Sequence, residues 1–571
     1  MTKPKVFVIG VGMTKFCKPG SRDWDYPDMV KEAVTTALDD CKLKYSDIQQ
    51  ATVGYLFGGT CCGQRALYEL GFTGIPIFNV NNACASGSSG LFLCKQIIES
   101  GWFYSMMVWE NGIQPAITSG NADVVLACGF EKMATGSLDT QAGNSDDRAL
   151  PVDNHIQVMA DTYGLFPAPI TAQMFGNAGK EHMEKYGTKR EHFAKIAWKN
   201  HLHSVHNPNS QFTKEFTLDQ VINARKIYDF MGLLECSPTS DGSAAAVLCS
   251  ERFLEKNPHL KSQAVEIVGL KLGTDQPSVF KENSNIKMIG FDMIQKISSE
   301  LYKETGVTPN DVQVIELHDC FAPNELITYE ALGLCDIGEI KKNPSAKIGI
   351  VTICLCPGKG GTIVDRGDNT YGGRWVINPS GGLISKGHPI GATGVAQVVE
   401  LSNQLRGKCG KRQVPNCKMA MQHNIGIGGA GVVGLYRLAF PSSSSTSTAP
   451  ANNMGAFKSD VVFEEIRERI TEEKDLVKKV AASFRINVTA PDGSVKKWTI
   501  DAKSNPPYVG NEERPVEIEI SVKDGDFMNM AAGKMKPDQA FMQGKMKLKG
   551  NIAKAMKLKN LLDPKMLKAK I

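Results

Sequence analysis

The chain has 571 residues, too many for one hydrophobic core, so two or more domains are expected. Hydrophobic residues make up 42% of it and charged residues 22%, which excludes a disordered, collagenous or fibrous protein. The formal net charge of +5 is small for this length and gives no reason to expect a nucleic-acid partner. No apolar run approaches the ~18 residues of a membrane span, and the first residues lack a secretory signal.

Strand-like and helix-like stretches alternate through the first three quarters of the chain. The pattern predicts an amphipathic helix at 28–38 and strands at 6–9, 124–127, 312–317 and 419–422. Such alternation predicts an α/β layered architecture with parallel or mixed sheets.

The sequence also contains a weak internal repeat. Residues 77–98 run from a strand through a small-residue turn into a helix, and residues 375–405 do the same. Two similar halves that face each other would bring the two turns together.

The clearest domain boundary is the Ser/Thr/Pro-rich stretch 441–455, which has no large residue to anchor a core and predicts a flexible linker. We therefore expect domains at 1–440 and 456–571, the first with halves at about 1–260 and 261–440. The region after the linker predicts a compact α+β domain. Its expected elements are a charged helix at 461–480, strands at 484–489, 495–500 and 516–522, and helices from Asp526 onward.

Charge and cysteine are distributed unevenly between these parts. Residues 456–571 hold 23 Lys and Arg against 17 Asp and Glu, and all 15 cysteines lie between Cys17 and Cys417. An odd number of irregularly spaced cysteines argues against a disulfide framework and favours a reducing compartment.

Cys84 is the first candidate catalytic residue. It lies among small residues in Asn81-Asn-Ala-Cys-Ala-Ser-Gly, after a predicted strand and before a predicted helix at 91–98. A helix start favours thiolate, and the small neighbours leave room for a substrate carbonyl. The alternative interpretation is a buried structural cysteine, which is the usual fate of a free thiol.

Histidine supplies the other candidates. His388 lies in the glycine-rich turn Gly-His-Pro-Ile-Gly-Ala-Thr-Gly, where it is placed as a general base for a thiol. His318, Asp319 and Cys320 directly follow an apolar strand, at the end where α/β folds place sites, although Asp319 is equally suited to cap the next helix.

Two further interpretations are rejected. The glycine-rich segments 10–15 and 426–431 do not combine the dinucleotide fingerprint with a following helix. The histidines at 201, 203 and 206 have no zinc-site spacing to any cysteine pair, so no metal is expected.

Taken together, these motifs resemble the thiolase family and, within it, the sterol carrier protein X subgroup. The resemblance is carried by the Cys84 segment, the His388 loop, the His-Asp-Cys-Phe segment at 318–321, and Asn424-Ile-Gly426. The region after the linker is similar to the sterol carrier protein 2 domain, especially at 541–551. The resemblance implies two similar βαβαβαββ halves layered α/β/α/β/α, a small α+β lipid-binding domain, and a homodimer formed through the thiolase part.

The resemblance also implies roles for the residues. Cys84 would attack the 3-keto carbon of a 3-oxoacyl-CoA, and its backbone N–H would form an oxyanion hole with that of Gly426. His388 would take the thiol proton and help to hold the thioester oxygen of the leaving enolate. With Asn424 where most thiolases have a cysteine, Cys320 becomes the expected second acid/base, beside His318 as a partner for the substrate oxygen.

Implied ligands and compartment follow from the same resemblance. Free coenzyme A would be co-substrate, no cofactor would be permanently bound, and products would be a shortened acyl-CoA plus acetyl-CoA or propionyl-CoA. Substrates would include 2-methyl-branched and sterol side-chain thioesters, and the C-terminal domain would bind fatty acids, acyl-CoA and sterols. The final Ala569-Lys570-Ile571 resembles the Ser-Lys-Leu peroxisomal signal, which implies an import receptor and the peroxisomal matrix, with the cytoplasm as second compartment.

Two apolar stretches, 102–120 and 336–356, depart from the family pattern. They can be packed loops, partner surfaces or segments absent from the working form, and the last interpretation is favoured because neither has turn chemistry suited to an inserted loop. The main alternative function is therefore a lipid-transfer protein whose thiolase part is impaired by them. A condensing enzyme that runs the same chemistry in reverse is the third hypothesis.

Overall fold

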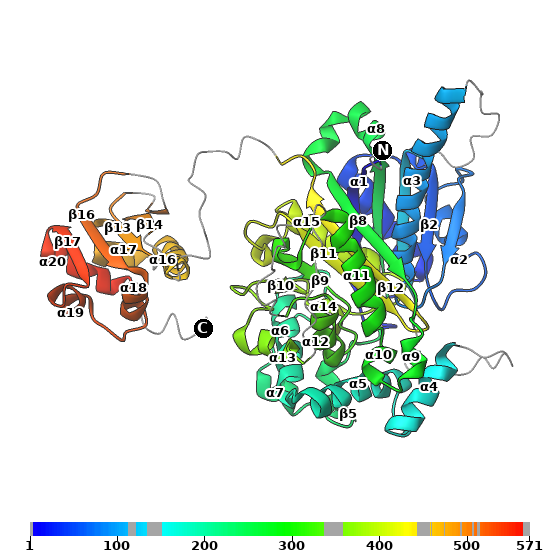
Figure 1. The fold of residues 1–571 in the computed structure, drawn as a ribbon. Coiled ribbons are helices and arrows are strands. Elements are labelled where there is room, and N and C mark those ends of the chain that lie inside the picture. Colours follow the sequence, from blue (N-terminus) through cyan, green and yellow to red (C-terminus); the bar gives the residue numbers. More distant parts are fainter. Residues whose placement is uncertain are drawn as a thin grey trace, which may run out of the picture. The chain divides into compact units, whose positions relative to one another are not determined.

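The computed structural model describes residues 4–111, 122–133, 151–335, 358–441, 457, 459–472, 474–490, 494–504, 507–510 and 514–562. The chain divides into two compact units, Met1–Ser442 and Ser443–Ile571 (Figure 1). Most of stretch 441–455 lies outside the described residues, as does all of 336–356. Among the helices described, none is both long and apolar enough to cross a bilayer.

The first unit is organised by a mixed sheet of ten strands. Their order across the sheet is β10 (Val376–Ile377), β9 (Val314–Glu316), β11 (Ala420–Gly426), β12 (Ala430–Leu438), β8 (Val265–Gly273), β1 (Val6–Met13), β7 (Gly242–Ser250), β4 (Val124–Glu131), β2 (Gln50–Gly54) and β3 (Ile77–Val80). The first five strands in sequence and the last five are arranged in the same order, and the first strand of each set, β1 and β8, pair antiparallel. The expected pair of similar halves is confirmed.

Helices cover the sheet and also fill the space between the halves. α1 packs on β1, β7 and β4, and begins where the Asp25 side chain accepts from the Tyr26 N–H. α3 and α15 contact each other, and α15 also contacts strands of both halves. The helices with eight or more residues are α1 (Tyr26–Cys41), α3 (Ser86–Asn111), α4 (Pro151–Thr162), α5 (Ile170–Tyr186), α6 (Arg190–Ser204), α11 (Phe291–Thr305), α12 (Ala322–Ala331) and α15 (Thr393–Leu405).

Short elements complete this unit. They are the helices α2 (Cys62–Tyr68), α7 (Leu218–Ile222), α8 (Glu251–Lys256), α9 (Ser278–Lys281), α10 (Asn285–Met288), α13 (Gly360–Arg366) and α14 (Gly382–Lys386), and the hairpin of β5 (Lys226–Tyr228) and β6 (Met231–Gly232). The backbone of α3 continues to Asn111, so the first part of the departing stretch 102–120 is helical, while 112–120 lies outside the described residues.

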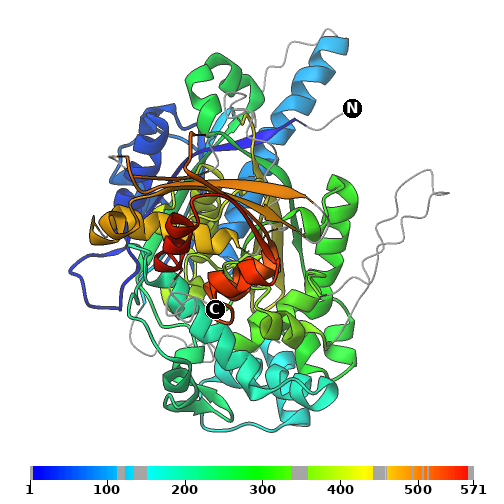
Figure 2. The ribbon, with the colours of Figure 1, turned by 90° about the vertical axis from the view of Figure 1, so that its left-hand side faces the viewer.

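The second unit has its own sheet of five strands. Their order is β15 (Tyr508–Gly510), β14 (Val495–Asp501), β13 (Ser483–Thr489), β16 (Ile518–Lys523) and β17 (Met546–Gly550). The helices gather on one face of this sheet (Figure 2) and enclose an apolar core that contains the stacked rings of Phe463, Trp498 and Phe527. They are α16 (Asp460–Glu472), α17 (Lys474–Val480), α18 (Asp524–Ala531), α19 (Pro537–Met542) and α20 (Ile552–Ala555).

The helix expected at 461–480 is covered by α16 and α17, apart from residue 473, which lies outside the described residues. One prediction for this unit was wrong in detail. The segment expected to be helical from Asp526 contains the edge strand β17, which pairs antiparallel with β16. In β17 Met546 is buried whereas Lys547 and Lys549 are exposed, so the alternation of a half-buried strand outweighs helix propensity there.

Candidate active site

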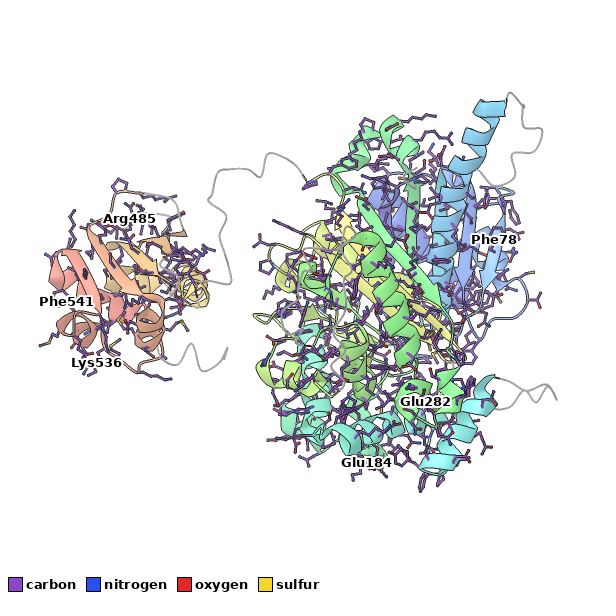
Figure 3. All side chains as sticks on the ribbon, viewed as in Figure 1. Phe78, Glu184, Glu282, Arg485, Lys536 and Phe541 are labelled. Carbon is purple, nitrogen blue, oxygen red and sulfur yellow. The ribbon has the colours of Figure 1, made fainter. Side chains whose placement is uncertain are left out.

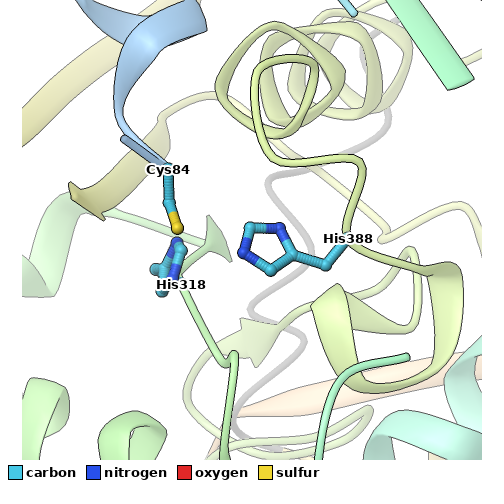
Figure 4. A group of neighbouring side chains, drawn as sticks. All are labelled: Cys84, His318 and His388. Atoms are coloured by element: carbon cyan, nitrogen blue, oxygen red, sulfur yellow. The ribbon is translucent and has the colours of Figure 1, made fainter. Parts of the chain in front are cut away.

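Cys84, His318 and His388 come from three distant segments and meet in one place (Figure 4). Cys84 lies between β3 and α3, His318 follows β9, and His388 follows α14. One side-chain atom of each residue, the sulfur or a ring nitrogen, lies within 4.8 Å of those of the other two. The two imidazole rings stand nearly perpendicular, at 85°, with centroids 5.2 Å apart. A thiol beside two imidazoles is suited to nucleophilic catalysis.

The turn that carries Cys84 is held rigidly. Ala83 has a φ of +47°, in the left-handed region that residues with a Cβ rarely adopt. The Ser86 hydroxyl donates to the Ala83 carbonyl at 2.6 Å and accepts from the Asn82 N–H at 2.9 Å, which stabilises this conformation. Cys84 is thereby presented, half-buried, immediately before α3.

The helix start, which was expected to favour the thiolate form of Cys84, does not lower the pKa of this thiol. Burial, with a smaller contribution from the Glu131 carboxylate, raises the pKa of Cys84 to about 12. Desolvation therefore outweighs the dipole of the helix start, and the resting group is a neutral thiol that needs a base.

The position of His388 depends on Asp319. Its carboxylate accepts from the Leu383 N–H at 2.6 Å and the Ile384 N–H at 3.2 Å, the free N–H groups at the start of α14. The alternative interpretation, that Asp319 caps the next helix, α12, is therefore wrong. Asp319 caps α14, the short helix that precedes His388. Within the His-Asp-Cys-Phe segment, His318 therefore lies in the cluster itself, whereas Asp319 holds the helix that precedes His388.

Glycines allow the His388 loop to reach the first half. A Cβ at Gly129 or Gly87 would lie 2.1 Å or 2.5 Å from the Gly391 carbonyl oxygen. A Cβ at Gly391 would lie 2.6 Å from the Gly54 carbonyl oxygen. These backbones approach too closely for any side chain, which explains the glycine content of the loop.

Hydrogen bonds determine which nitrogen of His388 is available. Nδ1 lies 2.7 Å from the Thr393 hydroxyl, which itself donates to the Pro389 carbonyl at 3.1 Å. The hydroxyl therefore accepts from Nδ1–H, and Nε2 carries a free lone pair. Burial, and secondarily His318, lowers the pKa of His388 well below its usual value, so the ring is neutral and Nε2 can accept a proton.

His318 has the same tautomer for a different reason. The Asn424 amide nitrogen donates to the Cys84 carbonyl at 3.0 Å and to Ser88 Oγ at 2.9 Å, so its oxygen faces His318 Nδ1 at 2.7 Å. Nδ1 therefore carries the proton and Nε2 is bare. Burial lowers the pKa of His318 to about 4. The expected donor role toward a substrate oxygen becomes available only after this ring has gained a proton.

The remaining predicted residues are placed as follows. A Cβ on Gly426 would lie 2.1 Å from the Asn82 carbonyl oxygen, so this glycine packs directly on the Cys84 turn. Cys320 is buried in the core outside the cluster of mutually close atoms, and burial, with Cys84 nearby, raises its pKa well above the usual value. Residues 569–571 lie outside the described residues.

Sequence reasoning missed one acidic residue. The Glu131 side chain is fully buried at the end of β4 and accepts from the N–H groups of Leu56, Phe57 and Gly391. The available signal was a lone carboxylate that ends the apolar run Val124–Phe130, where a buried strand would favour another apolar residue.

Comparisons with known proteins describe what the chain resembles. Residues 6–109 and 110–252 match the thiolase N-terminal domain, 280–347 and 351–433 the thiolase C-terminal domain-like family, and 463–563 the SCP-2 sterol transfer family. The breaks within the thiolase matches fall inside the departing stretches 102–120 and 336–356.

Individual relatives agree with these matches. Non-specific lipid-transfer protein-like 2 of Caenorhabditis elegans is 77% identical over 78% of this chain and 99% of its own. Sterol carrier protein 2 of Bos taurus is 51% identical over 98% of this chain and 96% of its own. The structure of human mitochondrial 3-ketoacyl-CoA thiolase has a TM-score of 0.51 at 18% identity, and the match covers 76% of this chain and 98% of that one, which shows a shared fold.

Proposed function

The chain belongs to the thiolase family of acyltransferases and ends in an SCP-2 sterol transfer domain, and from this we propose that it cleaves 3-oxoacyl-CoA with coenzyme A and binds lipid in its second unit. The observation that carries the proposed reaction is the meeting of the Cys84 thiol with two imidazoles whose Nε2 atoms are unprotonated. No permanently bound cofactor enters the proposal.

The first half-reaction uses the groups in this order. His388 Nε2 accepts the Cys84 proton, and the sulfur attacks the 3-keto carbon of the substrate. The bond between C2 and C3 then breaks, so the shortened acyl group remains on Cys84 as a thioester. The C2 carbanion of the departing thioester takes up a proton and leaves as acetyl-CoA or, from a 2-methyl substrate, propionyl-CoA.

Two features support the rest of the cycle. The raised pKa of Cys320 keeps that thiol protonated, which suits the proposed second acid/base that protonates the carbanion. Gly426 packs on the Cys84 turn, which suits an oxyanion hole made by the N–H groups of these two residues. Coenzyme A then takes the acyl group, and the Cys84 thiol is restored.

The proposal is tested with straight-chain, 2-methyl-branched and sterol side-chain 3-oxoacyl-CoA thioesters. The full chain should consume them only when coenzyme A is present, with acetyl-CoA from the straight chains and propionyl-CoA from the branched ones, measured by chromatography. If no member of the panel is cleaved while a fluorescent fatty acid still binds, the alternative of a lipid-transfer protein with an impaired thiolase part replaces this proposal.

The proposed compartment is the peroxisomal matrix, with some protein in the cytoplasm. It is supported only by Ala569-Lys570-Ile571, whose similarity to Ser-Lys-Leu would suit the import receptor. Deletion of these three residues should move a fluorescently tagged chain from peroxisomes to the cytoplasm. An unchanged distribution would contradict the assignment.

The proposed homodimer is supported by a sheet edge on which no further strand lies among the described residues. β3 is one of the two edge strands of the large sheet, and its Phe78 is 43% exposed (Figure 3). Exposed edges with apolar side chains are sites of association. Light scattering should give a mass twice that of one chain, and a Phe78→Glu substitution should lower this mass.

A further inference from the structure

Glu131 is a buried carboxylate that is held by backbone N–H groups. Its side chain is fully buried, and among the described residues it takes part in no ion pair. Its oxygens accept from the N–H groups of Phe57 at 3.0 Å, Leu56 at 3.1 Å and Gly391 at 3.0 Å. Burying an unpaired charge is costly, so a group of this kind in a core suggests a task beyond packing.

The three N–H groups belong to two separate segments. Leu56 and Phe57 follow strand β2 of the first half, whereas Gly391 lies three residues after His388 in the second half. Contact between the segments is close, because a Cβ at Gly391 would lie 2.5 Å from the Phe130 carbonyl oxygen. Glu131 is therefore one of the side chains that join the loop of the proposed base to the half that carries the nucleophile, beside Ser240, whose hydroxyl accepts from the His388 N–H at 3.0 Å.

We propose that Glu131 is a positioning residue for the reaction, because its carboxylate sets the place of the His388 loop relative to Cys84 through these three N–H groups. This inference depends on the proposed function only for the identity of the reaction that Glu131 supports. The hydrogen bonds of Glu131 are part of the fold, whatever the reaction is.

The charge of Glu131 has a second effect, on the thiol. The ionised carboxylate raises the pKa of Cys84 and so opposes thiolate formation until a base accepts the proton. Removing the charge should therefore make the resting thiol more reactive while it loosens the His388 loop. A residue with a purely structural role would not change these two properties in opposite directions.

The same geometry predicts a pH dependence. Burial, with a smaller contribution from Asp241, which directly precedes β7 and is itself paired with Lys132, raises the pKa of Glu131 to about 7 against the lowering effect of the three N–H bonds. Cys84 and His388 remain a thiol and a neutral imidazole between pH 6 and 8. Because a carboxylate accepts N–H bonds more strongly than a carboxylic acid, the loop should be best held above pH 7. The rate should thus rise with pH across this window.

The test is Glu131→Gln, which keeps the shape and removes the charge. For the unaltered chain we expect kcat/KM to rise about tenfold from pH 6 to pH 8, as for one ionisation with a midpoint near 7. In the variant this rise should disappear, and kcat at pH 8 should fall about tenfold or more with KM for coenzyme A unchanged. Glu131→Asp retains a charge, so it should keep the pH dependence even if its activity is low.

A second measurement does not depend on turnover. Alkylation of Cys84 by iodoacetamide, followed by mass spectrometry of its peptide, should be several-fold faster in Glu131→Gln than in the unaltered chain at pH 8. The matched control is Glu330→Gln, another buried carboxylate that accepts two backbone N–H groups, from Gly358 and Gly360, and does not shift the pKa of Cys84. It should leave the pH profile and the alkylation rate unchanged.

The outcomes separate the two proposals. A pH profile that persists in Glu131→Gln, or a slower alkylation of Cys84, contradicts the role given to Glu131. If the unaltered chain cleaves no 3-oxoacyl-CoA, the proposed function fails, while the alkylation comparison still decides whether Glu131 acts on Cys84.

Discussion

Replacing Cys84 by alanine should lower coenzyme A-dependent cleavage of the best 3-oxoacyl-CoA substrate by about 10⁴-fold or more. The sulfur forms the bond that holds the acyl group, so no other described group can replace it in that step. The two imidazoles remain in the variant, but neither Nε2 has a thiol proton to accept. Steady-state thiolysis measures the loss.

The acyl intermediate gives the same prediction a direct readout. Incubated with substrate and no coenzyme A, the unaltered chain should gain the mass of one shortened acyl group, and Cys84→Ala should gain none. Cys94→Ala is the matched control because Cys94 is a fully buried thiol of α3, the helix that follows Cys84, and contacts Thr52 instead of the site. Turnover of Cys84→Ala within tenfold of the control would refute the nucleophile.

The features of this site that could be predicted are those that depend on the sequence immediately around each residue. Small residues around Cys84 and glycines around His388 are visible in the sequence because each meets a local requirement, for room or for close backbone approach. The repeat between 77–98 and 375–405 correctly indicated that two similar halves face each other, since each contains the third strand of its half and the following helix.

What could not be predicted depends on distant partners. Burial outweighs the helix start at Cys84, and the depth of burial is a property of the assembled halves. Asp319 caps α14, which lies more than sixty positions further along the chain, instead of the helix next to it. Strand β17 has only a five-residue alternation of its own, and pairing with β16 determines its conformation.

The tautomers are a further example of this limit. No sequence pattern states that Asn424 donates to the Cys84 carbonyl and so turns its oxygen to His318. Thr393, the first residue of α15, does the equivalent for His388 from only five positions away in the sequence. The bond between Thr393 and His388 is local and could be anticipated from the sequence, whereas the bond between Asn424 and His318 could be found only from the fold.

Replacing His388 by alanine should slow formation of the acyl intermediate by about 10²- to 10⁴-fold, the range expected for loss of a general base. Since the pKa of Cys84 is about 12, almost no thiolate exists at pH 7.5 without a proton acceptor. The remaining imidazole of His318 has a bare Nε2, which makes a residual rate expected instead of complete loss. Single-turnover mass spectrometry of the acyl intermediate measures the rate.

Two companion variants distinguish proton transfer from loop disruption. Thr393→Val removes the hydroxyl that fixes the His388 tautomer, together with its bond to the Pro389 carbonyl, so about a tenfold loss is expected. Added imidazole should partly restore His388→Ala, because alanine leaves a space beside the sulfur, and should leave Thr393→Val unaffected. Equal rates for His388→Ala and the unaltered chain would show that His318, and not His388, accepts the Cys84 proton. If imidazole failed to rescue, His388 would act mainly by holding its loop in place.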